Sequence, residues 1–367
     1  MNTVLICVSV LLGLISAQSV PSVENLIKSD GYPVETHFHT TSDGYILRIH
    51  RIPQLKNHSA KVALVHHGLA CSSADFLLLG PGQALPYMLH DAGFDVWLLN
   101  DRGNTQSRNH TTLSPHDRDF WDFSWHEIGV IDLPETIDLI LKTTGASEIY
   151  YVGHSQGTTT LYVMTAVLPE YSSKIKVAIS MAPIAFLGHL NNWVQKYLAR
   201  FVWIFTEFTQ SFGHFEVMFG PNVANQKILD IFLFLNRPVN MNENMKSKIN
   251  AWVPAGASTK QTIHYSQLMN SGHFRYYDYF VGNIAIYGSI EPPDYDLGHV
   301  NFPNYLFWSN NDLLSSEKDV KLLCKAIGSS CTMVSFSHYN TTHRDYLYSR
   351  FASEKIYSKI VNIFNKS

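Results

Sequence analysis

Short apolar runs alternate with amphipathic stretches along most of the chain. Apolar runs rich in β-branched and aromatic residues predict strands, and apolar positions at helical spacing predict helices. The predicted strands cover residues 34–40, 45–52, 62–66, 94–99, 149–152, 177–180, 305–309 and 333–336. The predicted helices cover residues 84–92, 125–143, 158–167, 318–326 and 346–364. This alternation predicts an α/β fold with a mostly parallel central sheet and helices on both faces.

The alternation stops between residues 184 and 303. Aromatic-rich apolar stretches at 201–205 and 231–235 are separated by Asn-rich segments, and Pro292-Pro293 ends the region. We expect a helical cap here, inserted between two parts of the sheet domain at residues 18–183 and 304–367. The apolar surface of such a cap has two explanations that the sequence leaves open. It either packs as ordinary core, or it lines an acyl-chain pocket or meets a lipid surface.

The N-terminus predicts a compartment. Residues 4–15 are apolar, and Ser16-Ala17-Gln18 then supplies the small residues of a signal-peptidase site. We therefore expect a signal peptide at residues 1–17 and a secreted or lysosomal protein. No later stretch has the roughly 20 apolar residues of a membrane-spanning helix. The net charge is −3 without a long basic run, which argues against nucleic acid as the main partner.

The first candidate catalytic motif follows the strand predicted at residues 149–152. This strand runs into Gly153-His154-Ser155-Gln156-Gly157, and a small-residue helical stretch follows at once. A strand, a sharp turn and a helix in this order hold a serine hydroxyl out at the edge of a sheet. Gly153 and Gly157 are expected to remove side chains that would collide around the strained turn. The alternative is a Gly-rich turn without chemistry.

A serine nucleophile needs a base, an acid that orients the base, and donors for the oxyanion. In the predicted fold the chain order is serine, acid, histidine. Asp312 follows the strand at 305–309 and is the candidate acid; the alternative is that it forms an Asx turn or a helix N-cap. Two histidines, His338 and His343, follow the last strand, and spacing alone does not separate them.

The oxyanion donors are expected to be backbone N–H groups. Gln156, directly after the serine, supplies one. The loop His66-His67-Gly68-Leu69 follows an early strand, and Gly68 allows close backbone approach. The N–H of Leu69 is therefore the second candidate donor.

The cysteines and sequons add expectations for a secreted chain. Cys324 and Cys331 flank a Gly-containing turn and could pair, leaving Cys71 as the odd thiol; three reduced cysteines are the alternative. Asn57, Asn109, Asn340 and Asn365 each begin an Asn-x-Ser/Thr triplet, and the first three are our candidate glycosylation sites. The 18 histidines are scattered without a zinc-ligand spacing, so no metal site is expected.

These motifs together resemble the acid lipases of the α/β-hydrolase fold, including gastric and lysosomal acid lipases and insect relatives. The resemblance runs from about residue 34 to near the C-terminus. Its motifs in this chain are Gly31-Tyr32-Pro33, Thr41 to Leu47, Arg51-Ile52-Pro53, His67-Gly68-Leu69, Asp95 to Leu98, Arg102-Gly103-Asn104, Asp132-Leu133-Pro134, Gly153 to Thr158, Pro254-Ala255-Gly256, Ser271-Gly272, Tyr277-Asp278 and Asp312-Leu313-Leu314.

The resemblance also distinguishes the two histidines. The family's catalytic histidine precedes an aspartate by two residues and then an aromatic residue, as His343-Arg344-Asp345-Tyr346 does here. One departure concerns the cap: digestive vertebrate members carry a cysteine pair there, and this chain has none in that region.

What the resemblance implies is a serine lipase acting on neutral lipids at an interface. Ser155 would attack the ester, His343 would take its proton, and Asp312 would orient His343, with no metal or organic cofactor. Two alternatives stay open: a carboxylesterase for shorter soluble esters, and a catalytically silent lipid-binding or storage protein.

Overall fold

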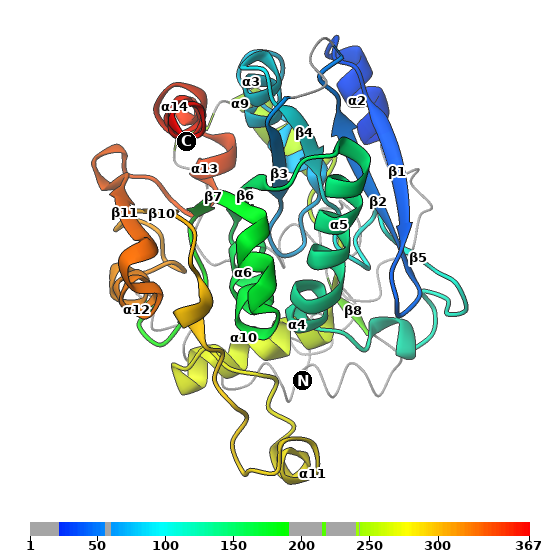
Figure 1. Cartoon of the computed structure of the whole chain (residues 1–367), viewed down its shortest axis with the longest axis vertical. Coiled ribbons are helices and arrows are strands. Elements are labelled where there is room, and N and C mark those ends of the chain that lie inside the picture. The colour runs from blue at the N-terminus through cyan, green and yellow to red at the C-terminus, as the bar shows by residue number, and fades with distance from the viewer. Residues whose placement is uncertain (1–21, 56–59, 191–214, 218–239, 242) are drawn as a thin grey trace, which may run out of the picture.

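The protein is built around a largely parallel β-sheet (Figure 1). The computed structural model describes residues 22–55, 60–190, 215–217, 240–241 and 243–367. The strands follow the order β1-β2-β4-β3-β6-β7-β10-β11, and the short β5 pairs with β2. Only the pairs made by β2 and its neighbours are antiparallel among the described strands of this sheet; the pairs from β4 to β11 are parallel. The predicted α/β fold with a mostly parallel sheet is confirmed.

The strand bounds lie within a few residues of the predicted ones. The strands of the main sheet are β1 (Glu35–Thr40), β2 (Tyr45–Ile52), β3 (Val62–His66), β4 (Asp95–Leu98), β5 (Asn109–His110), β6 (Ile149–His154), β7 (Ile175–Met181), β10 (Asn304–Trp308) and β11 (Cys331–Ser335). A second, two-stranded sheet joins β8 (Glu216–Val217) to β9 (Ala257–Ser258).

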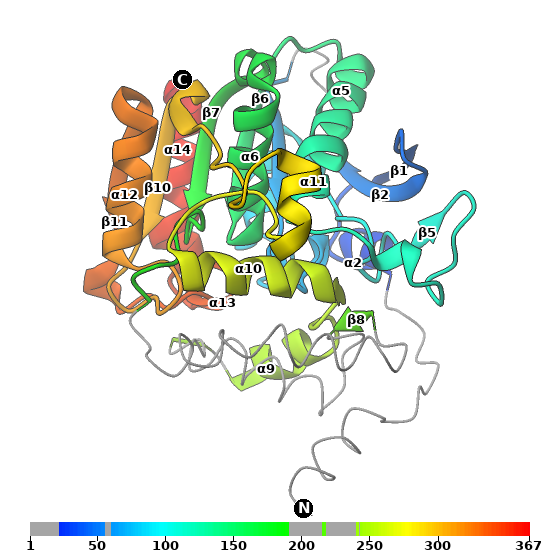
Figure 2. The same ribbon diagram turned by 90° about the horizontal axis from the view of Figure 1, so that it is seen from below.

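Helices cover both faces of the sheet, as Figures 1 and 2 show. They are α2 (Val23–Ser29), α3 (Leu85–Asp91), α4 (Trp125–Glu127), α5 (Leu133–Thr144), α6 (Gln156–Val167), α9 (Glu243–Asn250), α10 (Thr259–Ser271), α11 (Asn283–Tyr287), α12 (Glu317–Ile327), α13 (Asp345–Tyr348) and α14 (Ser358–Lys366). One buried core joins α2, α3 and α14 to the sheet, and another joins α4, α5, α6 and α12 to it. Neighbouring residues of β3 alternate between these two cores, as the period of two in a strand requires.

Two predicted helices are interrupted. Residues 128–132 form a π-helical turn between α4 and α5. The prediction of a single helix over residues 346–364 is wrong: α13 ends at Tyr348, and helical structure resumes only at Ala352. Between them the N–H of Arg350 donates to the carbonyl of Asn240 instead of continuing the helix. Contact with the region predicted as a cap thus overrides the local helical pattern.

The region predicted as a cap enters between two strands that are direct neighbours. β7 ends at Met181 and β10 begins at Asn304, and the two strands pair in parallel. The described part of the intervening chain includes α9, α10 and α11, and Figure 2 shows α9 and α10 near the end of the sheet at which β7 finishes. The bounds 184–303 remain a prediction. The stretches 201–205 and 231–235 and the predicted signal peptide at 1–17 lie outside the described residues.

Candidate active site

Ser155 lies at a sharp turn between β6 and α6. Its backbone angles are φ 53° and ψ −115°, a positive φ that is rare for residues other than glycine. The carbonyl of Ser155 accepts a hydrogen bond from the Thr158 N–H at 2.9 Å, and the N–H of Ser155 donates to the Met181 carbonyl at 3.1 Å. These bonds hold the strained residue between β7 and the first turn of α6, with its side chain at the carboxyl edge of the sheet.

The two glycines of the motif make this turn sterically possible. A Cβ on Gly153 would come within 2.8 Å of the backbone of Gly157, and a Cβ on Gly157 would come within 2.5 Å of the His66 carbonyl oxygen. Real Cβ atoms almost never approach so closely, so neither position accepts a side chain without a backbone shift. The collision predicted across the turn is confirmed for Gly153. For Gly157 the obstacle is instead β3, the neighbouring strand.

Three side chains that are distant in the sequence form one hydrogen-bonded line. Nε2 of His343 lies 2.8 Å from Oγ of Ser155. On the other side of the ring, Nδ1 lies 2.8 Å from Oδ2 and 3.1 Å from Oδ1 of Asp312. Asp312 is fully buried and His343 nearly so, whereas Ser155 is partly accessible. Of the two candidate histidines, His343 is therefore the one that the fold brings to the serine. His338 is exposed and lies beside the Tyr339 ring.

The surroundings of Asp312 keep its carboxylate ionised. Burial by itself would raise the pKa of Asp312, but the His343 ring and the N–H groups of Ser315 and Leu314 outweigh burial and lower that pKa below its ordinary value. Both N–H groups donate to Oδ1 at 2.9 Å. Asp312 thus also makes the Asx-type turn that was its alternative explanation, and the two roles coincide.

The loop after β3 packs directly against the serine. A Cβ on Gly68 would lie 3.2 Å from the Cβ of Ser155, so this loop approaches the turn as closely as a glycine allows. His67 fixes the loop: its Nδ1–H donates to the Gly68 carbonyl at 2.8 Å, and its Nε2 accepts the N–H of Asp101 at 3.1 Å. Burial lowers the pKa of His67, which favours the neutral ring that this arrangement requires. Leu69 follows in the turn, and Gln156 is the first residue of α6, where backbone N–H groups lack partners within the helix.

His154 also belongs to this site, although its role is not apparent from the sequence. Its Nε2–H donates to the carbonyl of His343 at 2.9 Å, so the residue before the serine anchors the backbone of the histidine that faces it. Burial, followed by the nearby His343 ring, lowers the pKa of His154 to about 3. His154 therefore stays neutral across ordinary pH. No sequence pattern signals this bond, because 189 positions separate the two residues.

A second missed group connects α10, in the predicted cap, to the serine turn. The side-chain NH₂ of Gln261 donates to Oε1 of Gln156 at 3.0 Å, and the NH₂ of Gln156 donates to Asp101 Oδ2 at 3.1 Å. Asp101 also contacts Nε2 of His66. All of these side chains are buried. The residue after the serine is consequently held from both the sheet and α10.

The remaining site predictions have separate outcomes. Cys324 and Cys331 form a disulfide between α12 and β11. Cys71 is a free thiol, and burial raises its pKa well above its ordinary value. Asn109 and Asn340 are exposed, as glycosylation acceptors must be, and Asn57 lies outside the described residues. Their glycosylation stays a prediction.

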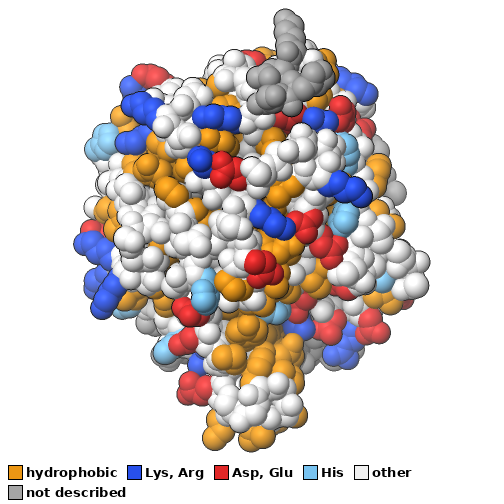
Figure 3. All heavy atoms as spheres, viewed as in Figure 1, with side chains coloured by type: hydrophobic (Ala, Val, Ile, Leu, Met, Phe, Trp, Pro, Cys, Tyr) orange, Lys and Arg blue, Asp and Glu red, His pale blue; other side chains and the backbone are white. Residues whose placement is uncertain are grey.

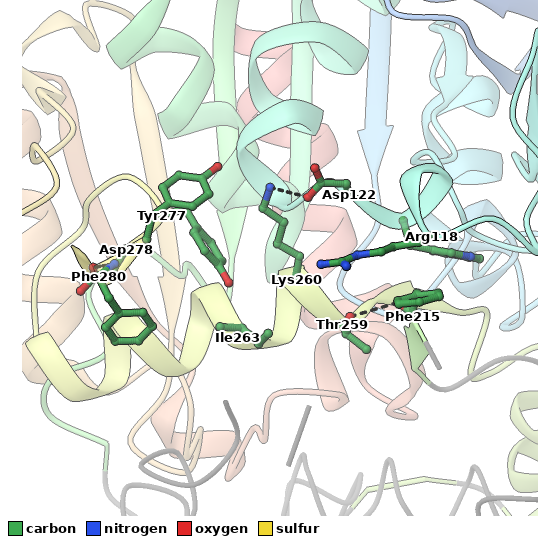
Figure 4. Close-up of a pocket in the computed structure, with 11 residues that line it drawn as sticks. Arg118, Asp122, Phe215, Thr259, Lys260, Ile263, Tyr277, Asp278 and Phe280 are labelled. Atoms are coloured by element: carbon green, nitrogen blue, oxygen red, sulfur yellow. Dashed lines mark hydrogen bonds and ion pairs between the residues drawn. The ribbon is translucent and has the colours of Figure 1, made fainter. Parts of the chain in front are cut away.

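A pocket of about 230 Å³ lies beside α10 (Figure 4). Aromatic and charged side chains line it, and Lys260 reaches Asp122 across it at 2.8 Å. None of Ser155, His343 and Asp312 belongs to its lining. Among the described residues, no group of three or more histidine, cysteine or acidic side chains is arranged to hold a metal ion. No described helix has the length and apolar character to cross a membrane.

Comparison with known proteins identifies the relatives of this chain. A family model for the α/β hydrolase fold matches residues 62–340, and one for a partial α/β-hydrolase lipase region matches residues 23–80. Lipase 1 of Drosophila melanogaster is 36% identical over 96% of this chain and 81% of its own length. Gastric triacylglycerol lipase of Bos taurus is 34% identical over 93% of this chain and 90% of its own length.

Solved structures share the fold at low identity. The crystal structure of a monoacylglycerol lipase from Paleococcus ferrophilus has a TM-score of 0.54 at 15% identity, covering 87% of this chain and 98% of that one. A carboxylesterase from Bacillus subtilis has a TM-score of 0.54 at 11% identity, covering 94% and 96%. The fold, the matched family regions and the lipase relatives lead to one conclusion: the chain belongs to the lipase family of the α/β-hydrolase fold that includes gastric triacylglycerol lipase and insect lipases.

Proposed function

We propose that this protein is a serine lipase that hydrolyses ester bonds of neutral lipids, triacylglycerols or cholesteryl esters, through an acyl-enzyme on Ser155. The observation that carries the proposal is the line of hydrogen bonds from Ser155 through His343 to Asp312 at the strained turn. This arrangement suits nucleophilic acyl transfer, because a weakly acidic hydroxyl needs an adjacent base that is itself oriented.

In the first half of the reaction, Oγ of Ser155 attacks the ester carbonyl and its proton passes to Nε2 of His343. Asp312 accepts the Nδ1–H of the same ring, which keeps Nε2 free to accept a proton and stabilises the imidazolium that forms. The imidazolium then donates its proton to the departing alcohol oxygen, which leaves the acyl group on Ser155.

In the second half, His343 takes a proton from water as the water attacks the acyl-enzyme. The imidazolium then returns this proton to Oγ of Ser155 as the bond between the acyl carbon and Oγ breaks, which releases the fatty acid. The backbone N–H groups of Gln156 and Leu69 are the proposed donors to the tetrahedral oxyanion. In studied serine hydrolases, one such donor lowers the activation barrier by about 3–4 kcal/mol. The close approach of Gly68 to Ser155 supports this placement of the loop.

The proposed substrate class and compartment have independent support. Several relatives of similar length are named triacylglycerol lipase or lipase, and the chain matches them over more than nine-tenths of its length. The disulfide between Cys324 and Cys331 favours an oxidising compartment. Together with the predicted signal peptide at 1–17, it supports a secreted or lysosomal enzyme. We propose that Asn109 and Asn340, the predicted glycosylation sites that the structure describes, are glycosylated in that compartment.

The proposal is tested by replacing Ser155 with alanine in the full chain. Wild type and Ser155→Ala are assayed on an ester series from short soluble chains to long-chain triacylglycerol and cholesteryl ester, and both are treated with a fluorophosphonate probe. We expect Ser155→Ala to lose labelling and essentially all hydrolysis. Ser173→Ala, which changes an exposed serine, should behave as wild type. Hydrolysis unchanged in Ser155→Ala would refute the mechanism, and wild-type activity confined to soluble esters would refute the lipid substrate.

A further inference from the structure

A charge-free apolar projection stands out from the body of the molecule between α10 and β10. The projection comprises residues 279–290, here called the apolar tip, and contains α11. Figure 1 shows α11 standing away from the sheet and its covering helices, and Figure 3 shows hydrophobic side chains gathered at that end. Its large apolar residues are unusually exposed: Phe280 54%, Val281 95%, Ile284 62%, Ile286 54% and Ile290 78%. Elsewhere in the described chain such exposure is scattered rather than clustered.

Hydrogen bonds within the apolar tip hold it in a defined conformation. Asn283, almost completely buried, donates to the Asp278 side chain and to the Ile290 carbonyl at 2.7 Å each, and accepts the Tyr279 N–H at 2.8 Å. The hydroxyl of Tyr287 donates to the Tyr277 carbonyl at 2.9 Å. The interior polar groups are thus paired with one another while the apolar side chains face outward. A segment that enters lipid needs this arrangement, because unpaired polar groups are costly there.

The charges around the apolar tip select the kind of surface that it can enter. From residue 279 to 290 the sequence has no charged residue. At the base are three acids, Asp278, Glu291 and Asp294. The nearby cations are Arg275, which pairs with Glu291 at 3.0 Å, and Lys260, whose Nζ lies 5.4 Å from the Tyr279 ring and pairs with a fourth acid, Asp122, at 2.8 Å. This excess of acid opposes an anionic surface. An uncharged or zwitterionic lipid surface accepts the apolar side chains without that repulsion.

The shape of the apolar tip favours lipid over a folded protein partner. A stable protein–protein interface buries about 800 Å² on each partner with close complementarity, which a short convex projection of a dozen residues does not offer to a second copy of itself. A fluid lipid surface deforms around a projection and needs no complementary pocket. Tyr279 and Tyr287, both half-buried beside the apolar residues, have the amphipathic rings that are enriched at lipid–water boundaries.

We infer that residues 279–290 insert into the surface of neutral or zwitterionic lipid aggregates and hold the enzyme there. The inference rests on the proposed lipase function, whose substrate forms such surfaces. The base of the apolar tip is fixed to α10 by a reciprocal pair of bonds between Gln267 and Asp278, at 2.8 and 2.9 Å. The same helix carries Gln261, which bonds to the residue after Ser155. Docking through the apolar tip therefore sets the orientation of the serine turn relative to the lipid.

The test replaces three outward apolar side chains in the full chain, Val281→Ser, Ile284→Ser and Ile290→Ser together, and leaves Phe280 intact because it lines the pocket of Figure 4. The matched control makes the same kind of change at three exposed apolar residues elsewhere: Phe38→Ser, Leu55→Ser and Leu322→Ser. Binding is measured by flotation with phosphatidylcholine vesicles in a Ser155→Ala background, so that no lipid is hydrolysed. Activity is measured on emulsified triolein and on a short soluble ester.

We expect the tip variant to bind vesicles at least about tenfold more weakly and to hydrolyse the emulsion at least about tenfold more slowly, since binding scales with inserted apolar area. Hydrolysis of the soluble ester and the melting temperature should match the control. Equal flotation of the tip variant and the control would overturn the inference. So would binding that strengthens with added anionic lipid, or a dimer in solution that the tip variant dissociates. If wild type hydrolysed no ester at all, the proposed function would fail, whereas flotation would still decide the role of the apolar tip.

Discussion

Replacing Asp312 with asparagine probes the proposed base most directly, because the surroundings of the side chain dictate how the amide must lie. Oδ1 accepts two backbone N–H groups, from Leu314 and Ser315, so the amide oxygen takes that position. The NH₂ group then occupies the position of Oδ2, which at 2.8 Å is the nearer of the two oxygens to Nδ1 of His343; Oδ1 lies at 3.1 Å. Two donors cannot face each other, so Nδ1 becomes the acceptor and the ring proton moves to Nε2. The nitrogen that faces Ser155 can then no longer accept the proton of the hydroxyl.

The cost follows from two losses. The tautomer that can accept the serine proton carries its own proton on Nδ1. In the variant this tautomer leaves the Nδ1–H of His343 facing the NH₂ group of the new amide in a buried place, which costs roughly 1–3 kcal/mol. The imidazolium also loses its carboxylate partner, and two unit charges about 4 Å apart at an effective dielectric constant near 20 interact by about 4 kcal/mol. The sum of about 5–7 kcal/mol corresponds to a decrease in kcat of about 10⁴-fold or more. The equivalent change in a serine protease triad lowers kcat by about 10⁴.

The assay is kcat on a short soluble ester, together with the rate of fluorophosphonate labelling of Ser155 and the melting temperature. Asp312→Asn should remain folded, because its size and its two backbone hydrogen bonds are kept. We expect hydrolysis and labelling to slow together while KM changes little. A variant that retained more than about one-tenth of wild-type kcat would show that Asp312 does not set the tautomer of His343.

Two further predictions concern the predicted cap. Gln261→Glu keeps the side-chain oxygen that accepts the Ser258 N–H, but it replaces the donor to Gln156 with a buried carboxylate oxygen that faces Oε1 of Gln156. The loss of one neutral hydrogen bond alone is worth about tenfold, so kcat/KM for a soluble ester should fall by at least about tenfold. Burial raises the pKa of Glu216 to about 7 against the opposing effect of Arg108, so between pH 4.5 and 7 the folded state binds more protons than the unfolded state. Stability from this group is therefore present below pH 4.5 and is lost as pH rises through 7, which should appear as a melting temperature that falls from pH 5 to pH 8.

Each of these predictions has a control. Gln83→Glu makes the same change at an exposed position and should leave kcat/KM as in wild type; an equal decrease in both variants would contradict the role of Gln261. Glu216→Gln keeps a side chain of the same size next to Arg108 but cannot ionise. Its melting temperature should vary less with pH than that of wild type. Parallel pH profiles would show that Glu216 does not contribute the expected dependence.

Features with a local cause could be predicted from the sequence. β2 and β3 have the predicted bounds, because β3 is a short apolar run, β2 is rich in β-branched and aromatic residues, and turn residues flank both. The nucleophile turn was predictable for the same reason: a strand, Gly153, Ser155, Gly157 and a helix follow one another directly, and each glycine is required by a clash that the structure locates. The order of Asp312 and His343 after the serine follows from the chain order of strands in this fold.

Features that depend on contacts between distant segments could not be predicted. Spacing left His338 and His343 equal, and only the turn after β11, which exposes the first and buries the second, separates them without recourse to family resemblance. The break in the helix expected over 346–364 depends on a bond to Asn240, in the region predicted as a cap. The sequence by itself determined the α/β pattern, the serine turn and the residue types of the site. The tertiary structure decided which side chains meet, because hydrogen bonds such as those of His154 and Gln261 join residues more than 100 positions apart.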